Sequence, residues 1–194
     1  MTQPAAHPQV IDFLLSRRSR PARMLRGAAP DPATLTRILT AAARVPDHGK
    51  LEPWRFIVIE GDARNRLADL LGQRGAALGR DAEKLAKDIA AWRDSPVTVA
   101  VVTVPRPTDR IPEWEQLLSA GAVCLSLVNA ALAQGYGACW LSGFAAYDRP
   151  FLELGLGLQP DERIAGFVHM GQCDTTPPER PRPDIALITE WLRN

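Results

Sequence analysis

The stretch RVPDHGKLEPWRF, residues 44–56, connects an amphipathic segment to an apolar run and sets the organisation of the chain around it. Before it, Asp31-Pro32 predicts a helix N-cap with proline at the first helical position, and this helix ends before Pro46. After it, Phe56-Ile57-Val58-Ile59 is a continuous apolar run, which predicts a strand buried on both faces. The stretch is therefore a helix-to-strand connection that concentrates polar donors, proline and tryptophan.

Outward from this connection, three further apolar runs predict strands at Val97–Val104, Ala138–Leu141 and Ile164–Gly171. Apolar residues at helical spacing predict helices over residues 8–18, 63–92 (broken near Gly72, Gly75 and Gly79), 114–134 and 150–154. Because several helices precede the first strand, we expect an α+β (α/β sandwich) architecture with helices on both faces of a small sheet. Residues 1–194 are expected to form one domain, with residues 171–194 as a C-terminal arm that docks through Ile188, Trp191 and Leu192.

Composition narrows the class of protein. The 194 residues are 46% hydrophobic and carry a net charge of +1, which gives no reason to expect a nucleic-acid or anionic-membrane partner. The three cysteines contain no CxxC pair, so neither a disulfide framework nor a cysteine-rich zinc site is expected. No signal peptide is predicted at Met1–Pro8, and the uncharged stretch Leu117–Tyr147 indicates a buried helix. We therefore expect a soluble, cytoplasmic protein.

Two motifs suggest binding of an anion and a flat ring. Arg17-Arg18-Ser19 offers guanidinium and hydroxyl groups that suit a phosphate, although cations at a helix C-terminus also have a purely structural explanation. In the connection itself, Arg44 and His48 can both donate to a ligand, and Pro53-Trp54 supplies a rigid step and a large flat surface. The structural alternative there is that Trp54 fills the core and His48 lies on the surface. Together the two motifs suit a phosphorylated, planar cofactor.

Other familiar motifs are excluded by order and spacing. Gly135-Tyr136-Gly137 follows a helix and precedes a strand, the reverse of a dinucleotide-binding loop, so these glycines are expected to turn the chain. Ser142 lacks the GxSxG context of a nucleophile elbow, and no metal-ligand spacing occurs among the histidines. Trp140 to Ser142 are instead expected at the end of a strand, where backbone donors can contact a ligand. We expect no side-chain nucleophile and no metal.

The order of these motifs resembles the FMN-dependent nitroreductase family, in its short, minimal branch. Further matching segments are Pro112-x-Trp114-Glu115-Gln116, the run from Ala130 to Gly137, and Trp140-x-Ser142-Gly143. The resemblance implies a nitroreductase-like fold with a small mixed sheet, assembled as an intertwined homodimer with FMN at the interface. It implies that FMN is bound by Arg17, Arg18, Ser19, Trp140, Leu141 and Ser142, with Arg44 and His48 reaching it from the partner subunit. Residues near the nicotinamide donor would be Ala130, Ala131, Leu132, Ala133, Gln134 and Gly135.

The activity implied by the resemblance is hydride transfer from NAD(P)H to FMN and then to an electron-poor acceptor such as a nitroaromatic or a quinone. Lys50 and Glu52 stand where many relatives carry Asn and Gln, and we expect Lys50, if it faces the flavin, to stabilise negative charge on the reduced ring. Arg180 and Arg182 are a second candidate pair for the phosphate. Three alternatives stay open: flavin fragmentation or reductive dehalogenation on the same fold, a flavin-storage protein with little turnover, and an interaction domain with no cofactor.

Overall fold

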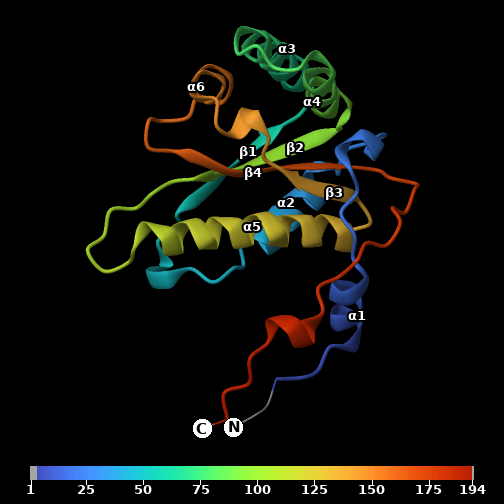
Figure 1. Cartoon of the computed structure of the whole chain (residues 1–194), viewed down its shortest axis with the longest axis vertical. Coiled ribbons are helices and arrows are strands. Elements are labelled where there is room, and N and C mark those ends of the chain that lie inside the picture. Colours follow the sequence, from blue (N-terminus) through green and yellow to red (C-terminus); the bar gives the residue numbers. More distant parts are fainter. Residues whose placement is uncertain (1–3, 194) are drawn as a thin grey trace.

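Four strands form one sheet in the order β1-β2-β4-β3, between two layers of helices (Figure 1). The computed structural model describes residues 4–193. The strands are β1 (Trp54–Ile59), β2 (Val97–Thr103), β3 (Gly137–Leu141) and β4 (Arg163–Gly171). The α-helices are α1 (Pro8–Ser16), α2 (Pro32–Ala42), α3 (Asp62–Ala77), α4 (Ala82–Asp94), α5 (Glu113–Ala133) and α6 (Arg149–Leu156). Short 3-10 turns are η1 (Ala22–Met24), η2 (His48–Lys50), η3 (Phe144–Ala146) and η4 (Ile185–Ile188).

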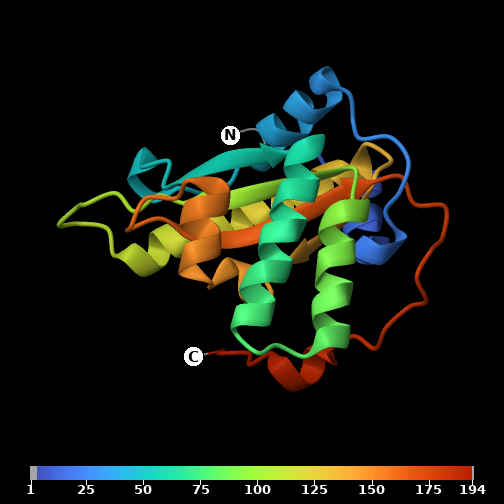
Figure 2. The ribbon, with the colours of Figure 1, turned by 90° about the horizontal axis from the view of Figure 1, so that it is seen from above.

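The expected α+β sandwich is confirmed, and each face of the sheet has its own core. Residues of β2 alternate between the two faces, and all of them are buried. Val97, Val99 and Val101 pack with α2 and α5, whereas Ala100 and Val102 pack with α3 and α6. Figure 2 shows α3 and α4 side by side across the second face. The predicted cap at Asp31 is present, because its side chain accepts from Thr34 N at 2.9 Å. Asp148 caps α6 in the same way, accepting from Phe151 N at 3.1 Å.

Every neighbouring pair of strands is antiparallel, where a mixed sheet was expected. Two helices, α3 and α4, connect β1 to β2. The second helix runs back beside the first, so β2 starts at the end of the sheet where β1 finishes. A single helix, α5, connects β2 to β3, so these two strands run in the same direction. The sheet is still antiparallel because β4 inserts between them.

Three features differ from the sequence-based expectations. β1 is an edge strand that pairs only with β2. It is also not buried on both faces, since Val58 is exposed and Ile59 is its one fully buried residue. The helix break falls at Leu78–Asp81, so it contains Gly79 as predicted, whereas Gly72 and Gly75 stay inside α3. Among the described residues the arm does not dock through its apolar side chains, since Ile188, Trp191 and Leu192 are all exposed.

The cysteines are all free thiols. Cys124 and Cys139 are buried, and burial raises the pKa of each thiol to about 12. Cys173 is partly exposed, just after β4, where the arm begins.

Helix α5 has the length and composition of a membrane span, but its surroundings are those of a core helix. It contacts β2, β3, β4 and α2 along one side. Its other side carries an apolar stripe that this chain leaves exposed, consisting of Trp114, Leu118 and Leu125. These residues recur at helical spacing, so they form one continuous face. The buried helix predicted from sequence is therefore buried on one side only.

Candidate functional site

Arg17, Arg18 and Ser19 directly follow α1, and the backbone then joins the edge of the sheet. The N–H of Arg20 donates to the carbonyl of Ala138 at 2.8 Å, which fixes this segment beside the start of β3. The side chains surround a small cavity of about 170 Å³, which we call the arginine hollow; it is lined by Phe13, Ser16, Arg17, Arg18, Arg20, Leu132 and Thr176. The structure therefore brings two of the three residues of the predicted phosphate motif into one cavity, with Ser19 beside them.

The donors of the arginine hollow are not fully satisfied within the described residues. Arg17 Nη2 donates to Ser19 Oγ at 3.1 Å, but Arg17 Nε and Arg20 Nη1 are buried and have no hydrogen-bond partner there. Burial lowers the pKa of the Arg17 guanidinium, and the neighbouring charges of Arg182 and Arg18 lower it further. Buried donors without acceptors, in a cluster of like charges, fit an anionic ligand such as a phosphate.

The C-terminal arm supplies the other groups at this cluster. The carboxylate of Glu179 pairs with Arg18 at 3.2 Å and with Arg182 at 2.8 Å, and Arg18 also donates to the carbonyl of Pro178. Of the two candidate arm cations, Arg182 thus reaches the cluster. Arg180 contacts Glu179 through its backbone N–H. Arg20 and Glu179 carry no sequence signal for this position, because the fold alone brings them here.

The second predicted motif lies at the opposite end of α5. His48 Nδ1 is 2.7 Å from Glu115 Oε2 in the first turn of that helix, whereas Leu132 of the arginine hollow belongs to its last turn. Leu132 lies 17 positions after Glu115 in the helix, which corresponds to about 25 Å. Arg44 follows α2 and is exposed. Within one chain, His48 and Arg17 therefore cannot contact the same end of a ligand, because they lie near opposite ends of α5.

Residues 49–52 adopt a strained backbone that is held from two sides. Gly49, Lys50 and Glu52 have positive φ angles of 73°, 54° and 47°, a conformation that costs energy for residues other than glycine. The carboxylate of Asp47 accepts from Leu51 N at 3.2 Å and from Glu52 N at 2.8 Å. On the other side, Arg106 Nε donates to the carbonyl of Leu51 at 3.3 Å. Strain of this kind clusters at functional sites. The side chain of Lys50, within this segment, is exposed.

Helix α5 anchors both ends of this loop. Ser119 Oγ donates to the carbonyl of Pro46 at 2.9 Å and accepts from Trp54 Nε1 at 3.3 Å. Trp54 packs against the core below α5, with its ring 6.1 Å from that of Phe56. The structure therefore supports the alternative in which Trp54 fills the core. Its indole is not free to stack against the ring of a ligand.

Trp140, Leu141 and Ser142 lie at the exposed end of β3, as predicted. They line a hollow of about 330 Å³ together with Asp88, Trp92 and His169. Burial raises the pKa of the Asp88 carboxyl, while the charge of Arg80 opposes that shift. Both Asp88 and Trp92 lie on α4, which sequence analysis recognised only as an amphipathic helix.

The indole of Trp140 is held by a β-bulge. Val101 pairs with Gly166 and Val102 with Ile164, so Ala165 is an extra residue in β4. Its carbonyl accepts from Trp140 Nε1 at 3.2 Å. A side chain at position 166 would overlap the indole, because a Cβ atom there would lie 1.9 Å from Nε1. Gly166 and the bulge thus fix the orientation of Trp140.

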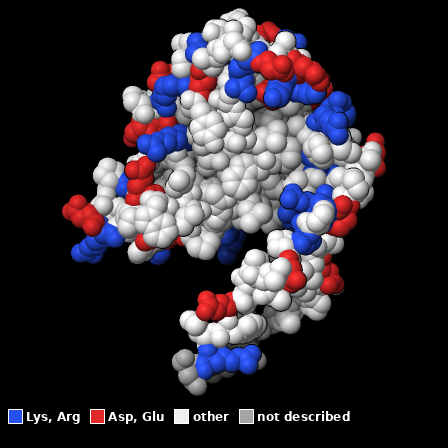
Figure 3. All heavy atoms as spheres, in the orientation of Figure 1, with Lys and Arg blue, Asp and Glu red and all other residues white. Residues whose placement is uncertain are grey.

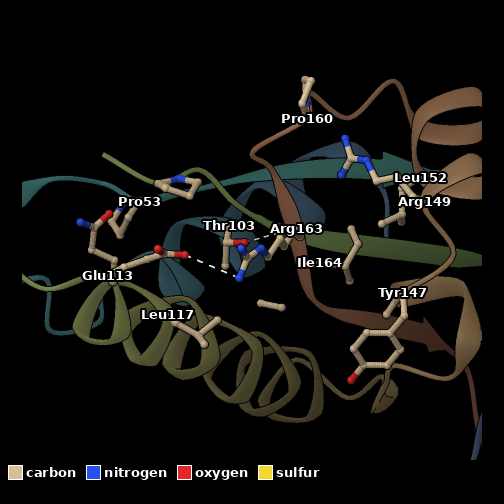
Figure 4. A pocket seen from close by; sticks show the side chains of 14 residues that line it. Pro53, Thr103, Glu113, Leu117, Tyr147, Arg149, Leu152, Pro160, Arg163 and Ile164 are labelled. Carbon is tan, nitrogen blue, oxygen red and sulfur yellow. Dashed lines mark hydrogen bonds and ion pairs between the residues drawn. The ribbon is translucent and has the colours of Figure 1, made fainter. Parts of the chain in front are cut away.

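Ala165 also lines a wider cavity of about 510 Å³ (Figure 4). Leu117 of α5, Ile164 of β4 and the exposed Tyr147 project into it, and Glu113 pairs with Arg163 at 3.6 Å at its margin. In the space-filling view, this part of the molecule is an uncharged recess with charged residues around it (Figure 3). A recess with mostly apolar walls beside a tryptophan suits a planar organic molecule.

The segment predicted to lie near a nicotinamide donor, residues 130–135, forms the end of α5 and the turn after it. Ala131 is buried in the core, whereas Ala133, Gln134 and Gly135 are exposed. Leu132 is the member of this segment that lines the arginine hollow. The segment thus borders the arginine hollow, on the side away from His48.

Groups of metal-ligating side chains are absent from the part of the chain that the structure describes. His169 has a structural setting: it is fully buried, its Nδ1 lies 2.9 Å from Thr98 Oγ1, and Trp92 packs edge-on against its ring. Burial lowers the pKa of His169 to about 4, so the ring is neutral at neutral pH.

The fold and the arrangement of these residues define the class, and comparison with known proteins agrees. The chain belongs to the nitroreductase family, whose model matches residues 14–172, and it is therefore an oxidoreductase of the nitroreductase type. It is 36% identical over 161 residues to YdjA of Escherichia coli K12, which bears the provisional name of an NAD(P)H nitroreductase; the match covers 83% of this chain and 86% of YdjA.

Solved structures show the same fold. A nitroreductase-like family protein from Bacillus cereus has a TM-score of 0.79 and 26% identity, with both chains covered completely. The FMN-dependent nitroreductase NfnB from Mycobacterium smegmatis, solved in complex with NADPH, has a TM-score of 0.76 and 19% identity. That comparison covers 96% of this chain and 99% of NfnB.

Proposed function

We propose that this protein is an FMN-dependent NAD(P)H oxidoreductase that reduces electron-poor acceptors such as nitroaromatics or quinones. The observation that carries the proposal is the arginine hollow, where Arg17 Nε and Arg20 Nη1 are buried without acceptors beside the edge of β3. A phosphate would supply those acceptors and offset the mutual repulsion of the arginines. The FMN dependence of NfnB from Mycobacterium smegmatis, and its complex with NADPH, support the choice of cofactor and donor.

We further propose that the protein acts as a homodimer paired through α5. His48 and the arginine hollow lie at opposite ends of this helix, about 25 Å apart. Two antiparallel copies of α5 would bring the His48 end of one beside the arginine hollow of the other. The exposed stripe of Trp114, Leu118 and Leu125 supplies the apolar contact that such pairing needs. In this arrangement Arg44 and His48 meet the cofactor of the partner subunit.

The chain's own residues then have separate tasks. Arg17, Arg18 and Ser19 bind the phosphate end, while Trp140, Leu141 and Ser142 border the ring. When bound, FMN supplies the hydride chemistry, accepting from NAD(P)H and delivering to the acceptor. The largely apolar cavity that Leu117, Tyr147 and Ile164 line would admit a flat molecule. Residues 130–135 are proposed to lie near the nicotinamide donor, and a cytoplasmic location would supply that donor.

The test is spectroscopic. The purified chain, incubated with FMN and desalted, is expected to retain a flavin absorption spectrum that NAD(P)H bleaches and a nitroaromatic or quinone restores. A chain that retains no flavin would contradict the proposal. Retained flavin that NAD(P)H does not bleach would indicate a binding or storage protein. Bleaching that neither acceptor reverses would indicate a more specialised flavin enzyme.

A further inference from the structure

Glu115 makes the shortest contact between α5 and the connection that precedes β1. Its Oε2 lies 2.7 Å from His48 Nδ1. An ionised carboxylate can only accept a hydrogen bond, so the proton of this pair resides on Nδ1. Within residues 4–193, no hydrogen bond is found for Nε2 of the same ring. Glu115 thus decides which nitrogen of His48 is available to a ligand.

The surroundings of the pair fix its direction. Glu115 belongs to a helix that packs on the sheet, and the backbone beside His48 is held by Asp47 and by Ser119. The imidazole is therefore anchored through both its backbone and its ring. The side chain of His48 is still 63% exposed, compared with 31% for Glu115. The pair lies in a shallow hollow with Trp114 and Leu118, which belong to the exposed stripe of α5.

We propose that Glu115 is a positioning residue for cofactor binding: it holds the proton of His48 on Nδ1 and aims Nε2 across the subunit interface at FMN. This inference rests on the proposed function, which places His48 against the partner's cofactor. Glu115 itself touches His48 and not the cofactor. A merely structural carboxylate at a helix N-terminus would instead stabilise α5 without any influence on the ring.

The first test needs no cofactor. In ¹⁵N NMR of the histidine side chains, His48 of the unaltered chain is expected to show a protonated Nδ1, with the signal assigned by its loss in His48→Ala. Glu115→Gln is expected to change the tautomer populations of His48, because the amide can donate as well as accept. Glu83→Gln is the matched control, since Glu83 is an exposed carboxylate in the first turn of α4. An unchanged His48 spectrum in Glu115→Gln would overturn the inference.

The second test measures FMN affinity in a double-mutant cycle. Glu115→Gln is expected to weaken FMN binding about 3- to 10-fold, as for the loss of one well-placed hydrogen bond, and Glu83→Gln to leave it unchanged. In the His48→Ala background, Glu115→Gln should cause no further loss. A full additional loss there would overturn the inference and assign Glu115 a structural role.

The two levels of the proposal fail in different ways. Absence of FMN binding by the unaltered chain would contradict the proposed function itself. Binding that depends on Arg17 but not on His48 would leave the proposed function standing and overturn the positioning role of Glu115.

Discussion

The guanidinium of Arg17 is partly buried, and its Nε has no hydrogen-bond acceptor within the described residues. Burial and the charges of Arg182 and Arg18 all disfavour its charged form, yet arginine does not lose its proton in proteins. We predict that Arg17→Met weakens FMN binding about 10- to 100-fold, because a hydrogen bond to a charged group is lost. Fluorescence titration of FMN against the flavin-free variant measures this.

Stability provides the complementary measurement for this variant. Since the charged side chain is penalised in the flavin-free chain, Arg17→Met is expected to retain or raise the melting temperature while binding fails. Arg37→Met is a suitable control, because Arg37 is exposed on α2, away from the hollow. A large loss of stability in Arg17→Met would show that the guanidinium serves the fold rather than a ligand.

His169 predicts a pH dependence of folding. Its pKa is about 4 in the folded chain, against an ordinary value of 6.5, so between these values the unfolded chain binds more protons. The free energy of unfolding should therefore be fully retained above pH 6.5 and fall by about 3 kcal/mol as the pH is lowered to 4. Urea unfolding across this range measures the slope, and His169→Gln should flatten it. The same slope in both proteins would place the titrating group elsewhere.

The sequence pattern names candidate site residues where a motif is local. Arg17 and Arg18 are neighbours in sequence, and both line the arginine hollow. Glu115 and Arg20 could not be predicted in the same way. Their positions depend on the His48 side chain, 67 positions away, and on the Ala138 carbonyl, 118 positions away, which only tertiary packing brings close. Trp54 illustrates a further limit, since a core indole and a ligand-facing indole have the same local pattern.

At the scale of elements, the bulge in β4 shapes the recess around Trp140. We predict that Gly166→Ala displaces the indole from the Ala165 carbonyl and destabilises the chain by about 1–3 kcal/mol, as for overpacking elsewhere. FMN affinity should fall as well, because Trp140 borders the proposed ring site. Urea unfolding and flavin titration measure the two effects.

A second glycine gives the matched control for Gly166→Ala. Gly72 lies inside α3, where a Cβ atom would meet Ile89 at 3.2 Å, a contact that small shifts can relieve. Gly72→Ala should therefore change stability little and FMN affinity not at all. If the two substitutions change stability and FMN affinity equally, the close packing of Gly166 against Trp140 contributes to neither.

Existence and type of the elements were predictable, whereas their pairing was not. Apolar runs identified β2 and β4 closely, because both are long and buried. Local patterns do not encode that β4 inserts between β2 and β3, so the antiparallel sheet and the edge position of β1 could not be derived. The bulge at Ala165 is equally invisible, since it arises from pairing across two strands.

At the scale of the whole molecule, the two ends of α5 separate the two halves of the proposed site. Sequence order places Arg17 and His48 only 31 positions apart, but the fold puts them at opposite ends of a long helix. In the proposed homodimer a second copy spans this distance. The distance itself could not be read from motif spacing.

The exposed stripe of α5 therefore makes assembly testable. We predict that Leu125→Glu shifts the protein from dimer to monomer in sedimentation experiments and abolishes FMN retention, because burying an unpaired carboxylate in an apolar interface is costly. Leu154→Glu is the control, since Leu154 is exposed on α6, outside the stripe. If the unaltered protein is a monomer and still retains FMN, both the proposed pairing and the proposed shared site are wrong.

The distribution of thiols has a practical consequence. At neutral pH Cys124 and Cys139 are shielded and protonated, so a maleimide dye should attach selectively at Cys173. That position adjoins the arm that carries Glu179 and Arg182 to the arginine hollow. A single native attachment point thus allows rearrangement of the arm to be followed by the emission of one environment-sensitive dye, without the introduction of a foreign cysteine.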